Sequence, residues 1–100
     1  MFTGTLICDL LLGDVHSLKE KRGVVRPLLA ELRRRFAVSA AEVGDADLHR
    51  RARVAVACVS GQAGHVTEVL DACERLVADR PEFDLLSARR TLVAADDEVR

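Results

Sequence analysis

The chain has 100 residues, of which 49% are hydrophobic and 31% charged, and it carries a net charge of −1. This composition is typical of one globular domain over residues 1–100, large enough to bury about two-thirds of its unfolded surface. The composition excludes a disordered chain. No apolar run approaches the roughly 20 residues of a membrane-spanning helix, and the N-terminus has no basic leader. We therefore expect a cytoplasmic protein with no membrane partner.

The first part of the chain predicts a strand and then a long helix. Residues 2–12 alternate with a period of two, which gives this strand one wholly apolar face. Ser17 and Glu20 form a capping box, in which the serine hydroxyl accepts a hydrogen bond from the backbone of Glu20 and the glutamate carboxylate reaches back to the serine N–H. Apolar residues follow at helical spacing, interrupted by a glycine and a proline. We therefore expect a helix over about 17–36 with a kink near 23–27.

The rest of the chain predicts three further strands and a second helix. Periodicity and turn residues indicate a strand over 38–43, a turn over 44–47, a strand over 53–60, a helix with apolar residues from 66 to 77 that stops before Pro81, and a strand over about 83–94. An acidic tail over 96–100 should be frayed. The order strand–helix–strand–strand–helix–strand matches the split βαβ motif. We predict an α+β fold of the ferredoxin-like class, a four-stranded antiparallel sheet with both helices on one face.

With both helices on one side, the other face of the sheet must meet water or a partner. The residues that alternation assigns to this face are more apolar than a wetted sheet surface usually is. They include Ile7, Leu11, Ala55, Ala57 and Val59. Since an exposed apolar patch usually marks an interface, we predict that these five residues form an oligomer face through which the protein pairs as a homodimer.

Three cysteines, Cys8, Cys58 and Cys73, lie far apart in the sequence. No CxxC string exists, so neither a zinc site nor a redox pair is indicated. Each cysteine lies among small apolar residues, where a thiol usually acts as a small hydrophobe. We expect three buried, reduced thiols, with a reactive or metal-binding thiol as the alternative.

Aspartates and histidines in two predicted turns are the candidates for acid–base chemistry. Asp14, His16, Asp45, Asp47 and His49 would converge if both turns lie at one end of the sheet. The same spacings are common in solvated polar turns, and no HxxxH or GxSxG string supports a catalytic or metal site. We therefore predict no catalytic residues, no cofactor and no metal, and an enzyme is the least favoured reading.

Two known activities of this fold class lack their residues here. Acylphosphatases use an arginine in the loop after the first strand and an asparagine on a later strand, whereas the loop over 13–17 has no arginine and the chain has no asparagine. RNA-recognition domains stack bases on aromatic side chains of the central strands. This chain has no tryptophan or tyrosine and three phenylalanines. The first activity is therefore excluded, and we expect no base stacking on the sheet.

Basic residues gather in the first half of the chain. Residues 17–53 hold ten Lys or Arg against five Asp or Glu, whereas residues 61–100 hold five against nine. At about 100° per residue, five cations of the first helix fall on one arc beside its apolar sector, and its glutamates fall on the opposite flank. These five cations, which we name the basic stripe, are Lys19, Arg22, Arg26, Arg33 and Arg34. The basic stripe suits contact with a phosphate backbone, although an ordinary solvated helix face has the same pattern.

Two strings of the sequence carry a resemblance to a known family. Residues 17–22 read SLKEKR and residues 36–48 read FAVSAAEVGDADL, and shorter matches continue over nearly the whole chain. In these strings the chain resembles the YlxP-like bacterial proteins, a family of unknown function. The resemblance implies a ferredoxin-like fold and no established enzymatic activity. Genes of the family often neighbour those of translation and ribosome maturation factors, so the resemblance also implies a role with RNA or the ribosome.

Three hypotheses follow for the function. The first is a non-enzymatic accessory protein that contacts structured RNA or a ribosomal particle through the basic stripe. The second is a homodimeric regulatory or scaffold module that works through the apolar sheet face. The third is an enzyme built on the aspartates and histidines of the two turns.

Overall fold

The computed structural model describes residues 1–95, so the predicted frayed tail over 96–100 lies outside the described residues. Four strands and two helices follow one another in the predicted order. The elements are β1 (Phe2–Leu12), α1 (Leu18–Arg35), β2 (Ser39–Gly44), β3 (Arg51–Ser60), α2 (Ala63–Ala78) and β4 (Phe83–Ala94).

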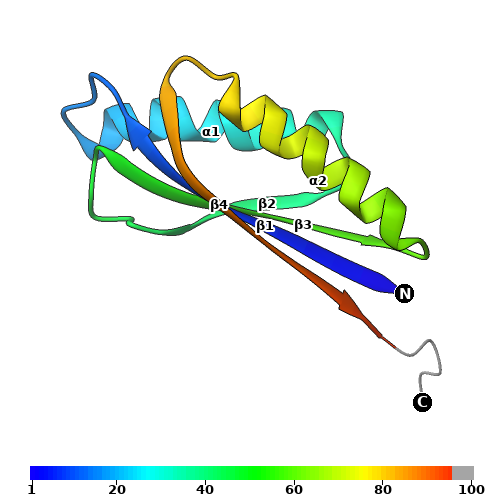
Figure 1. The fold of residues 1–100 in the computed structure, drawn as a ribbon. Helices are drawn as coiled ribbons and strands as arrows, with labels where there is room; N and C mark the ends of the chain where they lie inside the picture. Colours follow the sequence, from blue (N-terminus) through cyan, green and yellow to red (C-terminus); the bar gives the residue numbers. More distant parts are fainter. Residues whose placement is uncertain (96–100) are drawn as a thin grey trace.

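The strands form one antiparallel sheet in the order β2-β3-β1-β4, with β3 and β1 in the centre. Both helices lie on the same face of this sheet (Figure 1). Helix α1 packs chiefly against β2, whereas α2 packs across β1, β3 and β4. Each helix joins two parallel strands that have a third strand between them, which is the split βαβ motif. The predicted ferredoxin-like fold is confirmed.

The core lies between the sheet and the two helices. Alternate residues of β1, such as Leu6, Cys8 and Leu10, have no exposed surface, and Val54 and Val56 of β3 lie beside them. The apolar stripes of α1 and α2 cover these strands. The buried helical residues are Val25, Leu28, Leu29 and Leu32 of α1, and Val66, Leu70, Cys73, Leu76 and Val77 of α2. Burying one large apolar side chain contributes about 1.5–3 kcal/mol, so this layer is the main source of stability.

Gly4 allows α2 to approach β1 closely. A Cβ atom at this position would lie 2.3 Å from Val66 Cγ1 and 2.9 Å from Leu70 Cδ1, both closer than van der Waals contact. The missing side chain of Gly4 therefore sets the distance between the second helix and the central strand.

Helix α1 begins as predicted, with one difference in its cap. The Ser17 hydroxyl accepts a hydrogen bond from Glu20 N at 3.1 Å. The Glu20 carboxylate reaches back to the backbone N–H of His16, with a distance of 2.7 Å from N to Oε2, instead of the predicted N–H of Ser17. The carboxylate still satisfies a donor at the start of the helix, one residue earlier than in a standard capping box. The helix then continues through Pro27 as one element.

Strand β2 lies one residue later than the predicted 38–43, and the starts of β3 and α2 also differ from the predictions. Strand β3 begins at Arg51, two residues before the expected start, because Arg51 and Ala52 pair with Leu11 and Leu10 of β1. Alternation misses these positions since Arg51 is charged and exposed. Helix α2 begins at Ala63, ahead of the first buried residue of its apolar face. None of these differences changes the topology. Among the described residues, no helix is both long enough and apolar enough to cross a membrane.

Candidate functional site

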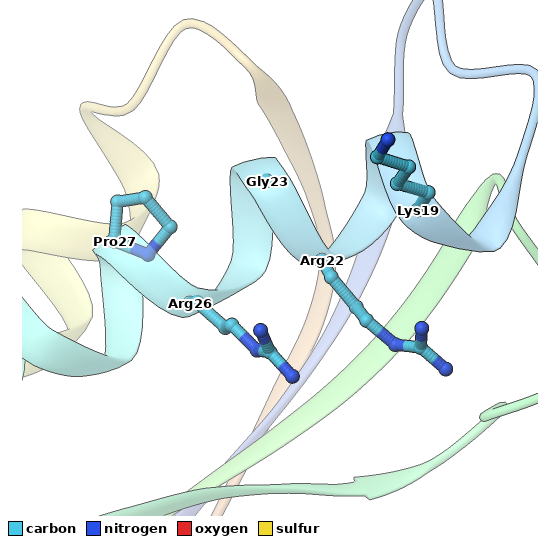
Figure 2. Close-up of a pocket in the computed structure, with 5 residues that line it drawn as sticks. All are labelled: Lys19, Arg22, Gly23, Arg26 and Pro27. Atoms are coloured by element: carbon cyan, nitrogen blue, oxygen red, sulfur yellow. The ribbon is translucent and has the colours of Figure 1, made fainter.

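The basic stripe lies on the flank of α1 that borders β2. Arg22 and Arg26 project from the same side of the helix, one turn apart (Figure 2). Gly23 has no side chain and leaves a shallow hollow of about 390 Å3, which Lys19, Arg22, Arg26 and Pro27 line together with it. The three cationic side chains are exposed. The structure therefore brings three of the five predicted site residues to one place.

The glutamates of α1 do not neutralise the basic stripe. Glu20 is engaged at the start of the helix, as described above. On the opposite flank, Glu31 Oε2 lies 2.6 Å from Nη1 of Arg80, and Glu31 Oε1 lies 3.5 Å from Nη1 of Arg35. Among residues 1–95, none of the five stripe residues has a carboxylate within ion-pair distance.

Arg33 differs from the other stripe residues because the fold uses its side chain. Its Nε donates a hydrogen bond to the Ala40 carbonyl at 3.1 Å, and its Nη2 donates to the same oxygen. Ala40 belongs to the edge strand β2, so the guanidinium satisfies a main-chain acceptor that has no neighbouring strand. A structural role thus accounts for Arg33.

The arginines near the start of β3 do not extend the basic stripe. Arg50 Nε donates to the carbonyls of Leu12 and Gly13, at 3.3 and 3.1 Å. Arg53 Nε lies 2.7 Å from Asp9 Oδ1, on the face of the sheet opposite the helices. The unpaired positive charge of α1 is therefore a local feature of the helix.

Lys21 is a buried charge that the sequence reasoning did not identify. Its side chain is 3% exposed, and its ammonium lies 2.7 Å from Glu42 Oε2. It also donates to the carbonyls of Asp45 and Leu48, at 2.7 and 2.8 Å. The two carbonyls therefore take two of the three donors of the ammonium, and the Glu42 carboxylate pairs with its charge. Because Lys21 belongs to SLKEKR and its partners to AEVGDADL, this contact, which we name the Lys21 clamp, joins the two strings that carry the family resemblance.

The Lys21 clamp holds the loop between β2 and β3. Asp45 has a φ of 59°, in the left-handed region that non-glycine residues seldom adopt. Its carbonyl accepts from Lys21 and also from Leu48 N at 3.1 Å. The clamp thus fixes a strained turn against the start of α1 and explains why a lysine lies inside the core.

The face of the sheet opposite the helices, which we name the open face, carries the predicted oligomer residues. Ile7, Leu11, Ala55 and Ala57 are half-buried there, and Val59 is 65% exposed. The small side chains of β2 and β3 leave a shallow, largely apolar hollow of about 200 Å3 over these strands. The structure therefore places all five residues on one face, as alternation predicted. Their role as an oligomer face stays a prediction.

One carboxylate of the open face is fully engaged within the chain. Asp9 Oδ2 accepts a hydrogen bond from the Ser87 hydroxyl at 2.6 Å, and Oδ1 accepts from Arg53. The hydrogen bond from Ser87, and then the one from Arg53, hold the pKa of Asp9 below its usual value. Asp9 therefore stays ionised at neutral pH and its charge is already balanced.

The three cysteines are buried free thiols, as expected. Burial raises the pKa of Cys8 to about 12 and that of Cys73 to about 11. Since the thiolate is the reactive form, neither thiol is a nucleophile in the folded chain.

Two of the candidate acid–base residues, Asp14 and His16, are in contact with each other. Asp14 Oδ1 lies 2.6 Å from His16 Nε2, but the two side chains are 92% and 77% exposed. The turn that carries His49 is joined to α1 through Lys21 and to the loop after β1 through Arg50. Over residues 1–95, no group of three or more histidine, cysteine or acidic side chains is arranged to hold a metal ion.

The family model of a protein of unknown function, DUF503, matches residues 3–90 of the chain. The chain belongs to this family. Among curated proteins, this DUF503 chain is similar to the uncharacterized protein YlxP of Bacillus subtilis (strain 168), with 30% identity over 77 residues. The similarity covers 77% of this chain and 84% of YlxP. The resemblance seen in the two sequence strings is confirmed.

Two solved structures are similar to this DUF503 chain in fold. The de novo designed protein LFR1 1, which has a ferredoxin fold, matches with a TM-score of 0.55 and 11% identity, over 100% of this chain and 93% of the design. A mutant of SnoaB, a cofactor-independent oxygenase from Streptomyces nogalater, matches with a TM-score of 0.46 and 11% identity, over 97% of this chain and 96% of that chain. At this identity the first match supports the fold alone, and the second carries no argument.

Proposed function

We propose that this DUF503 protein is a non-enzymatic accessory protein that contacts the phosphate backbone of structured RNA, free or in a ribosomal particle, through the basic stripe. The observation that carries the proposal is the grouping of Lys19, Arg22 and Arg26 around one hollow, with no carboxylate of the described chain beside them. The chain as a whole has a net charge of −1, so attraction to a polyanion has to come from a local group of cations such as this one.

Folding stability does not account for these three cations. Lys19 and Arg22 are spaced i,i+3, and Arg22 and Arg26 are spaced i,i+4, so both pairs repel at about 0.2–0.5 kcal/mol each. Lys19 also lies in the first turn of α1, where the helix dipole disfavours a positive charge. A polyanion bound along the helix would reverse both costs. By contrast, Arg34 lies in the last turn, where the dipole favours a cation.

The surrounding residues favour an RNA backbone over exposed bases. Phe83 is buried, and Phe2 and Phe36 pack against the core, so in the described chain no phenylalanine ring is fully exposed to stack on a base. Pro27 has no N–H to donate to the carbonyl four residues earlier, which is that of Gly23. The hollow therefore borders a main-chain acceptor that lacks its helical donor, and a ribose 2′-OH can supply one.

The first experiment is a titration of a labelled RNA hairpin, and of the DNA duplex of the same sequence, followed by fluorescence anisotropy. Three phosphate contacts predict that log K falls with log salt with a slope of about −2.7, which lowers affinity about 40-fold between 50 and 200 mM salt. The Arg22→Gln/Arg26→Gln variant should reduce that slope by about 2. RNA should bind more tightly than DNA.

The matched control is Arg51→Gln/Arg75→Gln, which removes the same charge from two exposed arginines outside the stripe. This control should bind RNA as the unchanged chain does. Unchanged binding by Arg22→Gln/Arg26→Gln would refute the proposal. Equal losses in both double variants would show a general charge effect and refute the local site.

A second experiment identifies the class of RNA particle. A low-salt lysate of cells that produce the protein is separated on a sucrose gradient. Co-sedimentation with a ribosomal subunit that is lost at moderate salt, and lost in the Arg22→Gln/Arg26→Gln variant, would support a ribosomal partner. Sedimentation with small RNA would assign the site to a free RNA.

A further inference from the structure

We propose that the open face binds a second copy of this chain, in a symmetric dimer whose two-fold axis runs roughly parallel to the strands. The proposal is independent of RNA binding, because the open face and the helices lie on opposite sides of the sheet (Figure 1).

The open face is uncharged at one end. Strand register places Ser39, Ala57, Thr5 and Thr91 in one row across the sheet, and Val59, Thr3 and Val93 in the next row. Val59 is 65% exposed and Val93 is 57% exposed. An antiparallel sheet that ends in water normally presents polar side chains on this face. Two rows without a charge therefore form the dry centre that a protein interface requires.

The same face contains both a hollow and a ridge. Ala41, Ala55 and Ala57 leave the hollow over β2 and β3. Across the sheet, Ile7 of β1 and Thr91 of β4 carry larger side chains beside it. A two-fold axis parallel to the strands lays β1 and β4 of one copy over β3 and β2 of the other. Each ridge then fills the hollow of its partner, which is the isologous contact of a symmetric dimer.

The charged end of the open face can form the rim of this interface. Asp9 is already bonded to Ser87 and Arg53 of its own chain, so covering it leaves no unpaired carboxylate. Arg89 lies nearer the hollow, paired with Ile7, but it belongs to the edge strand β4, where its long side chain can reach water.

The face is large enough for a stable dimer. Four strands spaced about 4.8 Å apart, with about ten residues rising about 3.4 Å each, cover roughly 650 Å2 per copy. Two copies would bury roughly 1,300 Å2, which exceeds the approximately 1,000 Å2 of a specific interface. Two sheets packed in this way form an aligned sandwich with the four helices outside.

The test is sedimentation equilibrium of the full chain from about 5 to 500 μM. The unchanged chain, of 10.9 kDa, should reach twice its monomer mass, and Ala57→Arg should stay monomeric with an unchanged circular dichroism spectrum. Ala55→Glu, which introduces the opposite charge one row away, should also be monomeric. The matched control is Ala78→Arg, on the exposed end of α2, which should dimerise normally.

The outcomes distinguish this proposal from RNA binding. A monomeric unchanged chain at 500 μM would overturn it, and so would a folded Ala57→Arg chain that still dimerises. The Arg22→Gln/Arg26→Gln variant should dimerise as the unchanged chain does, whether or not it binds RNA. Loss of dimer in that variant would place the contact on α1 and refute the open face.

Discussion

Replacement of Lys21 by methionine tests whether the Lys21 clamp is a major source of stability. Methionine keeps the length and the apolar stem but leaves the carbonyls of Asp45 and Leu48 without their charged donor. Breaking a buried ion pair by removing one partner costs about 3–5 kcal/mol. Because the Glu42 side chain is 28% exposed, it is less buried than that of Lys21, and we expect the lower end, about 3 kcal/mol.

The assay is urea unfolding of the unchanged chain and of Lys21→Met, followed by circular dichroism. In thermal unfolding, the same loss of about 3 kcal/mol would lower Tm by about 14 °C for a chain of this length. Hydrogen exchange should show where the loss arises. The amide of Leu48, which donates to the Asp45 carbonyl at 3.1 Å, should exchange faster in the variant than in the unchanged chain.

Lys19→Met provides a control within the same sequence string. Lys19 is exposed and has no carboxylate of the described chain beside it, so its replacement should change the free energy of unfolding by less than about 0.5 kcal/mol. If Lys21→Met lost less than about 1 kcal/mol, the loop would be held by its own hydrogen bonds and the reasoning would be refuted. The Lys21→Met/Glu42→Leu variant should recover part of the loss, because it removes the charge that the single variant leaves unpaired.

Two further substitutions have outcomes that the structure predicts. Gly4→Ala should lower the free energy of unfolding by about 1–3 kcal/mol, because the added Cβ would lie 2.3 Å from Val66 Cγ1; urea unfolding with no loss would mean that α2 can move away from β1. Asp9→Asn should destabilise the chain at neutral pH. The pKa of Asp9 is lowered in the folded chain, so its carboxylate stabilises the fold above about pH 4. This contribution is lost as pH falls through the lowered pKa. The difference between the two chains should therefore be constant from pH 7 to about pH 5 and shrink below about pH 4, and urea titrations that show a constant difference down to about pH 2 would contradict this assignment.

Local chemistry explains which parts of the fold could be predicted. The alternation of β1 predicted that Leu6, Cys8 and Leu10 share one face, and this face is buried beneath the helices. The Ser17 cap could be predicted because its donor lies three residues away. Where a partner lies in another element the sequence is silent, as with Arg33, whose acceptor is a backbone carbonyl of the edge strand.

Lys21 was missed because a charged residue on a helix is usually solvated. A signal did exist, since about 100° per residue places Lys21 at about 300° from Leu18, between Leu28 at about 280° and Leu32 at about 320°. A lysine in the middle of an apolar sector indicates a buried ammonium that needs partners. The partners themselves lie more than twenty residues away in a turn, and only the three-dimensional fold brings them to the helix.

The buried thiols have a consequence for measuring the motions of the core. Cys8, Cys58 and Cys73 lie on β1, β3 and α2, which are the elements that pack together at the centre of the domain. A thiol reagent can modify them only when a segment opens, so the labelling rate at each cysteine reports the opening of one element. Mass spectrometry of the labelled chain would thus rank the opening rates of two central strands and one helix without any amino-acid substitution.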